Sequence, residues 1–218
     1  MGRIKRFNLK KLMLQNQADF FFETGTWKGD GLAYAATFPF KKLYSSEIIE
    51  TIAKNAVERF KNNNRVIIIN KSSTDALKQY GITLQGNTIF WLDAHFPGAE
   101  EGINGYNEIE EETIKLPLQK ELEMIAARKK SFKDIILIDD LRIYEEGAFE
   151  SGNLPESVIP PNNRNTNFVE TLFGNTHNII KLYQDEGYLA LLPKSLTDLS
   201  FLENFYFNQI NKLFKKLL

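Results

Sequence analysis

Carboxylates stand at the ends of four of the five strands that the sequence predicts for a parallel sheet. Glu23 and Glu47 end the first two strands, Asp93 follows the fourth, and Asp139 and Asp140 follow the fifth. In an open α/β sheet, ligands bind beyond the carboxyl ends of the parallel strands. Carboxylates crowded at one such edge repel each other and usually need a cationic partner. The pattern therefore indicates a site for a positively charged ligand or a metal ion.

The first strand runs into a glycine-containing loop, Glu-Thr-Gly-Thr-Trp-Lys-Gly at 23–29. Glycine lets the backbone turn sharply and approach a ligand closely. The helix that follows offers free amide groups to an anion such as a carboxylate. With glycines at 25, 29 and 31, the loop departs from the dinucleotide-binding spacing of i, i+2 and i+5. A plain tight turn is the alternative interpretation.

Glu47, at the end of the second predicted strand, is another candidate ligand-binding residue. The two oxygens of a carboxylate match the vicinal hydroxyls of a ribose. The alternative is an acid that is simply solvated at a strand end. The loop at 23–29 and Glu47 support each other, because both would contact parts of one nucleotide-like ligand.

Together with Trp-Leu-Asp-Ala-His at 91–95 and Ile-Asp-Asp at 138–140, these motifs resemble those of class I S-adenosylmethionine (SAM)-dependent methyltransferases. Within that class, the sequence resembles the metal-dependent sugar O-methyltransferases of the macrocin type over residues 19–192. The resemblance implies an α/β fold, a three-layer αβα sandwich with a Rossmann-like methyltransferase sheet. It also implies methyl transfer from SAM to an oxygen of a small polar acceptor, such as a sugar or a glycoconjugate precursor.

The resemblance also assigns roles to individual residues. Glu47 would hold the ribose of SAM, and Lys71 and Ser72 would contact its adenine. Carboxylates after the fourth and fifth strands hold Mg²⁺ in macrocin-type enzymes. The other members of the implied cofactor site are Glu23, Thr24, Gly25, Thr26, Trp27, Gly29 and Asp93, and the implied Mg²⁺ ligands are Asp93, Asp139 and Asp140.

His95 stands where the family usually has the second acid of an Asp-x-Asp motif. The reaction needs a base, because a sugar hydroxyl is a poor nucleophile while it is protonated, and a divalent cation lowers the pKa of a hydroxyl bound to it. His95 or Asp93 is the candidate base. The alternatives are a hydrogen-bonded structural histidine at His95 and an Asx-type turn at Asp139 and Asp140.

The elements that must position these residues alternate between apolar strands and helical patterns, which is typical of parallel sheets with crossover helices. Apolar runs predict strands at 19–23, 42–47, 65–70, 87–92 and 134–138. Helical spacing predicts helices at 27–38, 48–62, 73–80 and 116–130, with a short one at 168–173. Two further runs, 177–183 and 188–192, predict a hairpin. The sheet is therefore predicted to be mostly parallel with an antiparallel C-terminal hairpin strand.

Three segments complete the predicted organisation. The acidic connection at 96–113 is either a solvated loop or a lid over the acceptor site. The proline-containing stretch at 145–167 is a predicted loop or flap. We expect a methyltransferase domain at 1–195, with an N-terminal helical extension at 1–18. The aromatic tail predicts a C-terminal helix at 196–218 that packs on the domain or on a partner in a homodimer.

Composition limits the classes of protein to consider. The 218 residues are 43% hydrophobic with a net charge of -1, which fits one globular domain and argues against general nucleic-acid binding. The absence of cysteine excludes disulfides, thiolate catalysis and zinc–thiolate sites. No apolar run is long enough to span a bilayer and no secretory signal is visible, so we expect a cytoplasmic protein.

Some conspicuous side chains are interpreted as structural. Trp91 and the phenylalanines at 20–22 belong to predicted strands and are expected in the core. His177 begins a predicted strand away from the carboxylate edge and is expected to be structural as well.

Two other functions stay open from the sequence. An NAD-dependent oxidoreductase or epimerase would use a similar sheet, although the glycine spacing is unfavourable for it. A non-catalytic module would keep the SAM pocket and lack turnover. Cofactor binding separates the first alternative from a methyltransferase, and turnover separates the second.

Overall fold

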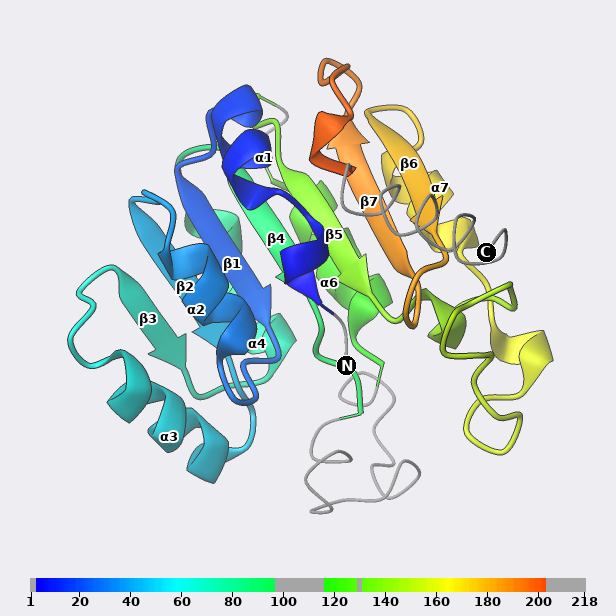
Figure 1. The fold of residues 1–218 in the computed structure, drawn as a ribbon, viewed down its shortest axis with the longest axis horizontal. Coiled ribbons are helices and arrows are strands. Elements are labelled where there is room, and N and C mark those ends of the chain that lie inside the picture. The colour runs from blue at the N-terminus through cyan, green and yellow to red at the C-terminus, as the bar shows by residue number, and fades with distance from the viewer. Residues whose placement is uncertain (1–2, 97–115, 129–130, 203–218) are drawn as a thin grey trace, which may run out of the picture.

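The computed structural model describes residues 3–96, 116–128 and 131–202, and its strands form one seven-stranded sheet (Figure 1). The strand order is β3-β2-β1-β4-β5-β7-β6. β1 to β5 pair in parallel, and β7 is antiparallel to both β5 and β6. The strands are β1 Phe20–Thr24, β2 Lys42–Ser46, β3 Val66–Ile69, β4 Thr88–Leu92, β5 Ile135–Asp139, β6 His177–Leu182 and β7 Tyr188–Pro193. The predicted mostly parallel sheet with an antiparallel hairpin strand is confirmed.

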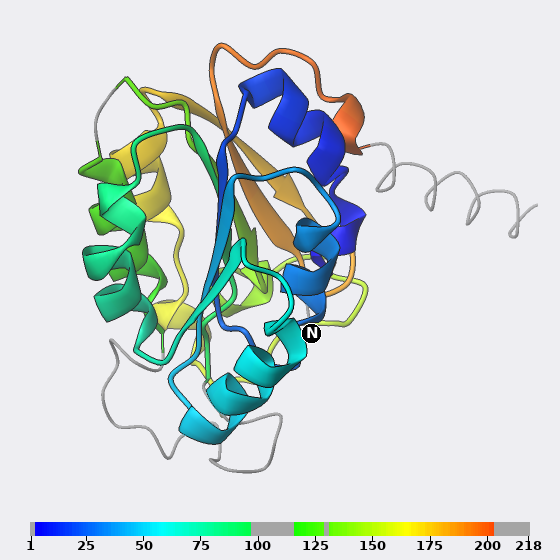
Figure 2. The ribbon, with the colours of Figure 1, turned by 90° about the vertical axis from the view of Figure 1, so that its left-hand side faces the viewer.

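Helices cover both faces of the sheet, which gives the three predicted layers (Figure 2). One face carries α1 Leu9–Asn16, α2 Asp30–Ala36 and α3 Glu50–Phe60; the other carries α4 Ser73–Gln79, α6 Leu118–Ala126 and α7 Asn167–Phe173. Short 3₁₀ turns are η1 Ile4–Arg6, η2 Gly81–Thr83, η3 Leu141–Ile143, η4 Pro161–Asn163 and η5 Ser200–Leu202.

The two layers of helices bury two separate apolar clusters against the strands. Phe21 and Trp91 point into the cluster with α1 and α2. Their neighbours Phe22 and Phe90 point into the cluster with α4, α6 and α7. Because both faces are covered, β4 and β5 are buried at every position, which is why their sequences read as continuous apolar runs. Trp91 and two of the three phenylalanines at 20–22 are fully buried, and Phe20 is partly buried.

The ends of the elements differ from the predicted ones where the backbone turns sharply. α2 begins at Asp30 and not at 27, since Trp27 and Gly29 have positive φ angles of 44° and 77°. Such left-handed residues cannot continue a right-handed helix. The stretch at 145–167 is a loop as predicted, apart from the η4 turn and the first residue of α7. It is held by the buried Arg164, which donates to the carbonyls of Leu154 and Ile159.

Two predicted segments fall largely outside the described residues. The acidic connection lies there from residue 97 onward, and the tail from residue 203 onward. Within the described residues, the predicted helix at 196–218 is not formed at 196–199, and only the short turn η5 follows. Phe201 and Leu202 of η5 are buried in the core of the domain. In the described part of the chain, no helix has the length and apolarity needed to cross a membrane.

Candidate functional site

The carboxylates expected to share a site lie along one edge of the sheet, the C-terminal ends of β1 to β5, which we call the rim. The last residues of neighbouring strands are in register: Thr24 lies opposite Ser46 and Leu92, and Leu92 lies opposite Ile138. Since these strands are parallel and aligned, the residues that follow them emerge side by side. The structure therefore brings the four predicted strand ends together.

The loop after β1 crosses the rim very close to β4. Gly25 has a φ of 82°, and a Cβ built on it would overlap the backbone carbonyl of Asp93. The backbone amides of Gly25 and Thr26 both donate to the carbonyl of Ser46, at 3.0 and 3.1 Å. A glycine is required at position 25 by both the φ angle and the space. A close backbone approach of this kind is what a loop that cradles a ligand needs.

Glu23 lies beneath this loop, almost fully buried. Its Oε2 accepts a hydrogen bond of 2.5 Å from the Ser45 hydroxyl, and Thr26 donates to Ser45 in turn. Burial raises the pKa of Glu23 to about 8; the bond from Ser45 works against this rise and the charge of Glu47 adds to it. A Cβ on Gly31 would contact the other oxygen, so the carboxyl faces the first turn of α2. Glu23 thus supports the loop through its hydrogen bond with Ser45, which in turn contacts Thr26.

Glu47 is fixed between the loop and the start of α3. Its Oε2 accepts from the backbone N–H of Trp27 and its Oε1 from that of Ile49, both at 3.0 Å. Each carboxylate oxygen can accept more than one hydrogen bond, so both keep capacity for a ligand hydroxyl. A preorganised carboxylate beside a glycine loop is well suited to hold a vicinal diol.

Lys71 and Ser72 lie next to Glu47 on the rim. The preceding residue, Asn70, donates through its amide to the carbonyl of Glu47 at 2.8 Å. Ser72 caps α4 by accepting from the backbone N–H of Asp75, and Lys71 is exposed. The structure therefore places both residues beside the ribose candidate, and their contact with an adenine stays a prediction.

On the other side of Gly25, Asp93, His95 and Asp139 form a compact group that we call the Asp–His–Asp cluster. One potential ligand atom from each side chain lies within 4.8 Å of the others. His95 Nδ1 is 3.7 Å from Asp93 Oδ1, and His95 Nε2 is 3.7 Å from Asp140 Oδ2. Asp140 itself, in a left-handed conformation, accepts from Arg142 Nε at 2.8 Å.

Burial and mutual repulsion shift both acids of the cluster toward their neutral forms in the absence of a cation. Burial, followed by the charge of Asp140, raises the pKa of Asp139 to about 7. Burial, followed by the charge of Asp139, raises the pKa of Asp93 well above its usual value. Two close carboxylates with so little solvent are the environment in which a bound cation gains the most.

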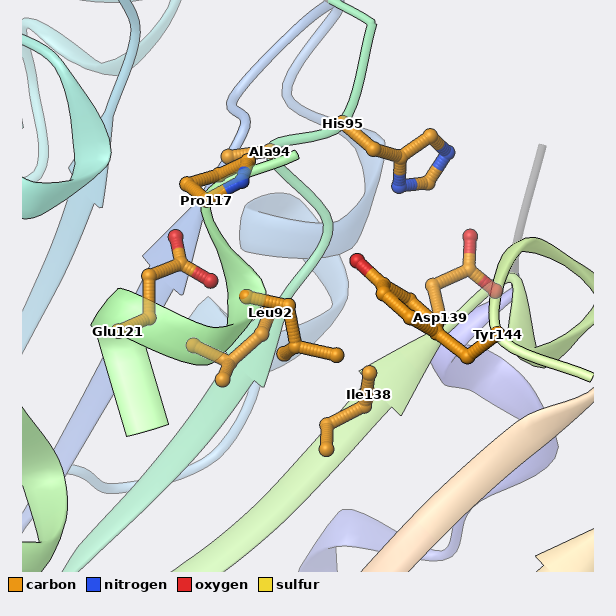
Figure 3. A pocket seen from close by; sticks show the side chains of 9 residues that line it. Leu92, Ala94, His95, Pro117, Glu121, Ile138, Asp139 and Tyr144 are labelled. Carbon is orange, nitrogen blue, oxygen red and sulfur yellow. The ribbon is translucent and has the colours of Figure 1, made fainter. Parts of the chain in front are cut away.

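Sequence reasoning missed three residues of the site: Glu121, Tyr144 and Arg142. Glu121 and Tyr144 line a small hollow beside the cluster, and Figure 3 shows Glu121 on one side of it with Asp139 and Tyr144 on the other. The full lining is Leu92, Ala94, His95, Pro117, Leu118, Glu121, Ile138, Asp139 and Tyr144. Glu121 had a detectable signal, since it follows Leu118 by three positions on the buried face of α6.

His177 lies at the opposite edge of the sheet, as expected. Its Nε2 is 3.0 Å from the carbonyl of Asp134, just before β5, and its Nδ1 is 2.8 Å from the Thr176 hydroxyl. Burial lowers its pKa. The residue is structural, and His95 is the histidine of the rim.

The sequence matches no protein-family model and no curated protein. Solved structures nevertheless share the fold. TomG, an O-methyltransferase from Streptomyces achromogenes solved with SAM, has 18% identity and a TM-score of 0.54 over 88% of this chain and 81% of that chain. An O-methyltransferase from Bacillus cereus in complex with SAH has 15% identity and a TM-score of 0.54 over 89% and 82%.

A third solved structure shows the same likeness. SAH-bound methyltransferase PaMTH1 from Podospora anserina has 13% identity and a TM-score of 0.53, over 89% of this chain and 80% of that chain. Identities of this size show a common fold. The chain therefore has the Rossmann-like methyltransferase fold, with the antiparallel strand β7 inserted between β5 and β6.

Proposed function

We propose that the chain is a SAM-dependent O-methyltransferase acting on a small polar acceptor, such as a sugar or a glycoconjugate precursor, with the help of a divalent cation. The observation that carries the proposal is one hydrogen bond: the backbone N–H of Trp27, in the glycine loop, donates to the Glu47 carboxylate. Both residues lie at the rim of a sheet with the methyltransferase strand order. This arrangement supplies a diol-binding carboxylate and a close backbone approach at one place.

SAM, when bound, supplies a sulfonium methyl that is transferred by in-line displacement, so the task of the chain is positioning. Glu47 would hold the ribose hydroxyls, with both its oxygens already oriented by backbone amides. Gly25 and the residues around it would lie along the methionine part, and Lys71 and Ser72 beside the adenine. The crowded acids of the rim favour a ligand with a positive charge.

The residues at the ends of β4 and β5 fit a divalent cation. Asp139 is 2% exposed, and neither of its carboxylate oxygens has a hydrogen-bond partner among the described residues. Asp93 and Asp139, with Asp140 or His95, would hold the ion, and three carboxylates with water suit Mg²⁺. A bound cation lowers the pKa of an acceptor hydroxyl. His95 or Asp93 would then accept the proton.

The structure of the sheet favours a methyltransferase over an NAD-dependent enzyme. The dinucleotide-binding sheet has a sixth parallel strand where this chain inserts the antiparallel β7. The glycine spacing at 25, 29 and 31 is also unlike the dinucleotide motif. SAM is therefore the better-supported nucleotide ligand.

Calorimetric titration with SAM, SAH and NAD⁺ tests the proposal. We expect micromolar binding of SAM and SAH and none of NAD⁺. Absence of SAM binding at millimolar concentration, or tight binding of NAD⁺, would overturn it. If SAM binds, methyl transfer from labelled SAM is then measured on a panel of sugars and nucleotide-sugars. Cofactor binding with no transfer to any of them would support the non-catalytic alternative.

A further inference from the structure

The ligand set that the structure assembles differs from the three aspartates that the sequence resemblance implies. The Asp–His–Asp cluster contains His95 in place of Asp140. Asp140 already has a cationic partner, because Arg142 donates to it from Nε at 2.8 Å and from Nη2 at 3.4 Å. An acid paired with a guanidinium is a weaker candidate for a metal than one without a partner.

The environment of Asp139 is independent evidence that the cluster binds a cation. It is buried at the end of β5, and both its oxygens lack a hydrogen-bond partner among the described residues. Burying a carboxylate without a partner costs roughly several kcal/mol unless a cation or a proton neutralises it. Its neighbours in the cluster, Asp93 and His95, offer atoms that can ligate the same cation.

We propose that the site binds a divalent transition metal ion through Asp93, His95 and Asp139, and that it prefers such an ion to Mg²⁺. The inference rests on the cation of the proposed function and specifies its identity. Two atoms bound to one ion at about 2.1 Å each lie roughly 3 Å apart. His95 Nδ1 and Asp93 Oδ1, now 3.7 Å apart, need to approach by about 0.7 Å, which small side-chain rotations can supply.

The selectivity follows from the imidazole. Mg²⁺ prefers carboxylate, carbonyl and water oxygens, whereas an imidazole nitrogen raises the affinity for Mn²⁺, Fe²⁺, Co²⁺, Ni²⁺ and Zn²⁺. Asp140 lies at the other ring nitrogen of His95, where a carboxylate commonly orients a metal-bound histidine. Ligation would also remove His95 from the candidate bases and leave the second oxygen of Asp93 to accept the proton.

Direct metal binding to the metal-free full-length chain tests this inference without any activity measurement. We expect Mn²⁺ to bind at least tenfold more tightly than Mg²⁺ in calorimetry. Electron spin-echo envelope modulation of bound Mn²⁺ should show ¹⁴N coupling from an imidazole. The chain has only two histidines, so the source of that coupling can be assigned with two variants.

Single-residue variants test whether His95 is a ligand of the metal ion. His95→Asp should remove the ¹⁴N coupling and bring the Mn²⁺ and Mg²⁺ affinities closer together, whereas His177→Gln should keep both properties. Asp139→Asn should lose metal binding, and Asp140→Asn should weaken it by roughly 10-fold, as loss of an orienting residue does. Circular dichroism checks that each variant is folded.

Three results would overturn the inference: tight Mn²⁺ binding without ¹⁴N coupling, equal affinity for Mn²⁺ and Mg²⁺, or no metal binding at all. In the last case, Asp93 and Asp139 would share a proton instead. SAM titration of the metal-free protein distinguishes this failure from failure of the proposed function. Retained SAM binding without metal binding rejects only the metal inference.

Discussion

Glu47 is the residue on which SAM binding should depend most directly. Glu47→Gln removes the charge and one of the two acceptors that hold the loop and the start of α3. Hydrogen bonds to a charged group contribute about 1.5–3 kcal/mol, so we expect SAM affinity to fall by about 10- to 100-fold in calorimetry. Glu50→Gln, an exposed acid that pairs with Lys54 nearby, serves as the control. Equal losses in both variants would contradict the ribose assignment.

Glu121 makes the stability of the fold depend on pH in a predictable direction. Burial raises its pKa from 4.5 to about 7, although the hydroxyls of Ser73 and Thr24 work against the rise. Between these two values the native state keeps a proton that the unfolded chain releases, so stability falls as pH rises through this window. The loss from this one group is at most about 3 kcal/mol.

Glu121→Gln should abolish that part of the pH dependence. In urea unfolding, the free energy of unfolding of the variant relative to that of the natural chain should increase as the pH rises from about 5 to about 8. Glu123→Gln, on the exposed face of the same helix, should change the pH dependence far less. A pH profile of Glu121→Gln that parallels the natural one would show that Glu121 is ionised in the folded state at neutral pH.

At the scale of elements, the turn after β1 can be tested with a matched pair of glycines. Gly25 and Gly152 have positive φ angles of 82° and 77°, but a Cβ would overlap the Asp93 carbonyl at Gly25 and meet nothing within 4 Å at Gly152. Gly152→Ala should therefore cost about 1 kcal/mol of stability from the φ angle alone. Gly25→Ala should cost at least about 2 kcal/mol more and abolish SAM binding.

Urea unfolding and SAM titration of the two variants check this prediction. If Gly25→Ala is no less stable than Gly152→Ala and still binds SAM, the loop can move away from β4, and its close approach is not needed for the cofactor. The comparison isolates the overlap, because the φ angles of the two glycines are nearly the same.

The elements themselves were predictable where local chemistry and packing agree. β4 and β5 are buried throughout because both faces are covered, and that is visible in the apolar runs at 89–92 and 135–138. The start of α2 was predicted too early, because the positive φ angle of Trp27 is imposed by the loop that Glu47 holds. Contacts between distant segments fix such ends, and periodicity does not record them.

The site shows the same division. The strand-end acids could be found because parallel strands bring their ends to one edge. Glu121 was missed because it reaches the site from a helix. The proposed exchange of His95 for Asp140 as a metal ligand was not predictable either, because it rests on the ion pair between Asp140 and Arg142. Both depend on side-chain directions across elements, which spacing along the chain does not determine.

At the scale of the whole molecule, the first residues are fastened to the C-terminal hairpin beside the rim. Arg6 donates to Asp185 from Nε at 2.9 Å and from Nη2 at 2.7 Å, and Tyr188 donates to the same carboxylate at 2.8 Å. Tyr188 lies opposite Asp139 in the sheet. The network thus joins the N-terminal segment to the β6–β7 hairpin, whose Tyr188 pairs with the cluster residue Asp139.

Arg6→Met should weaken the attachment of the N-terminal segment to the hairpin and lower the stability of the fold. Both charged side chains of the pair are mostly buried, with exposures of 15% and 14%, and a two-bond contact between charged groups of this kind contributes about 1–3 kcal/mol to stability. We expect a loss in that range in urea unfolding, and much less from Lys10→Met on the exposed side of α1. A double-mutant cycle with Asp185→Asn should give a coupling energy of about 1 kcal/mol or more, because the two residues share their bonds. A coupling energy near zero would mean that the buried Ile4 and Phe7 alone hold the N-terminal segment in place.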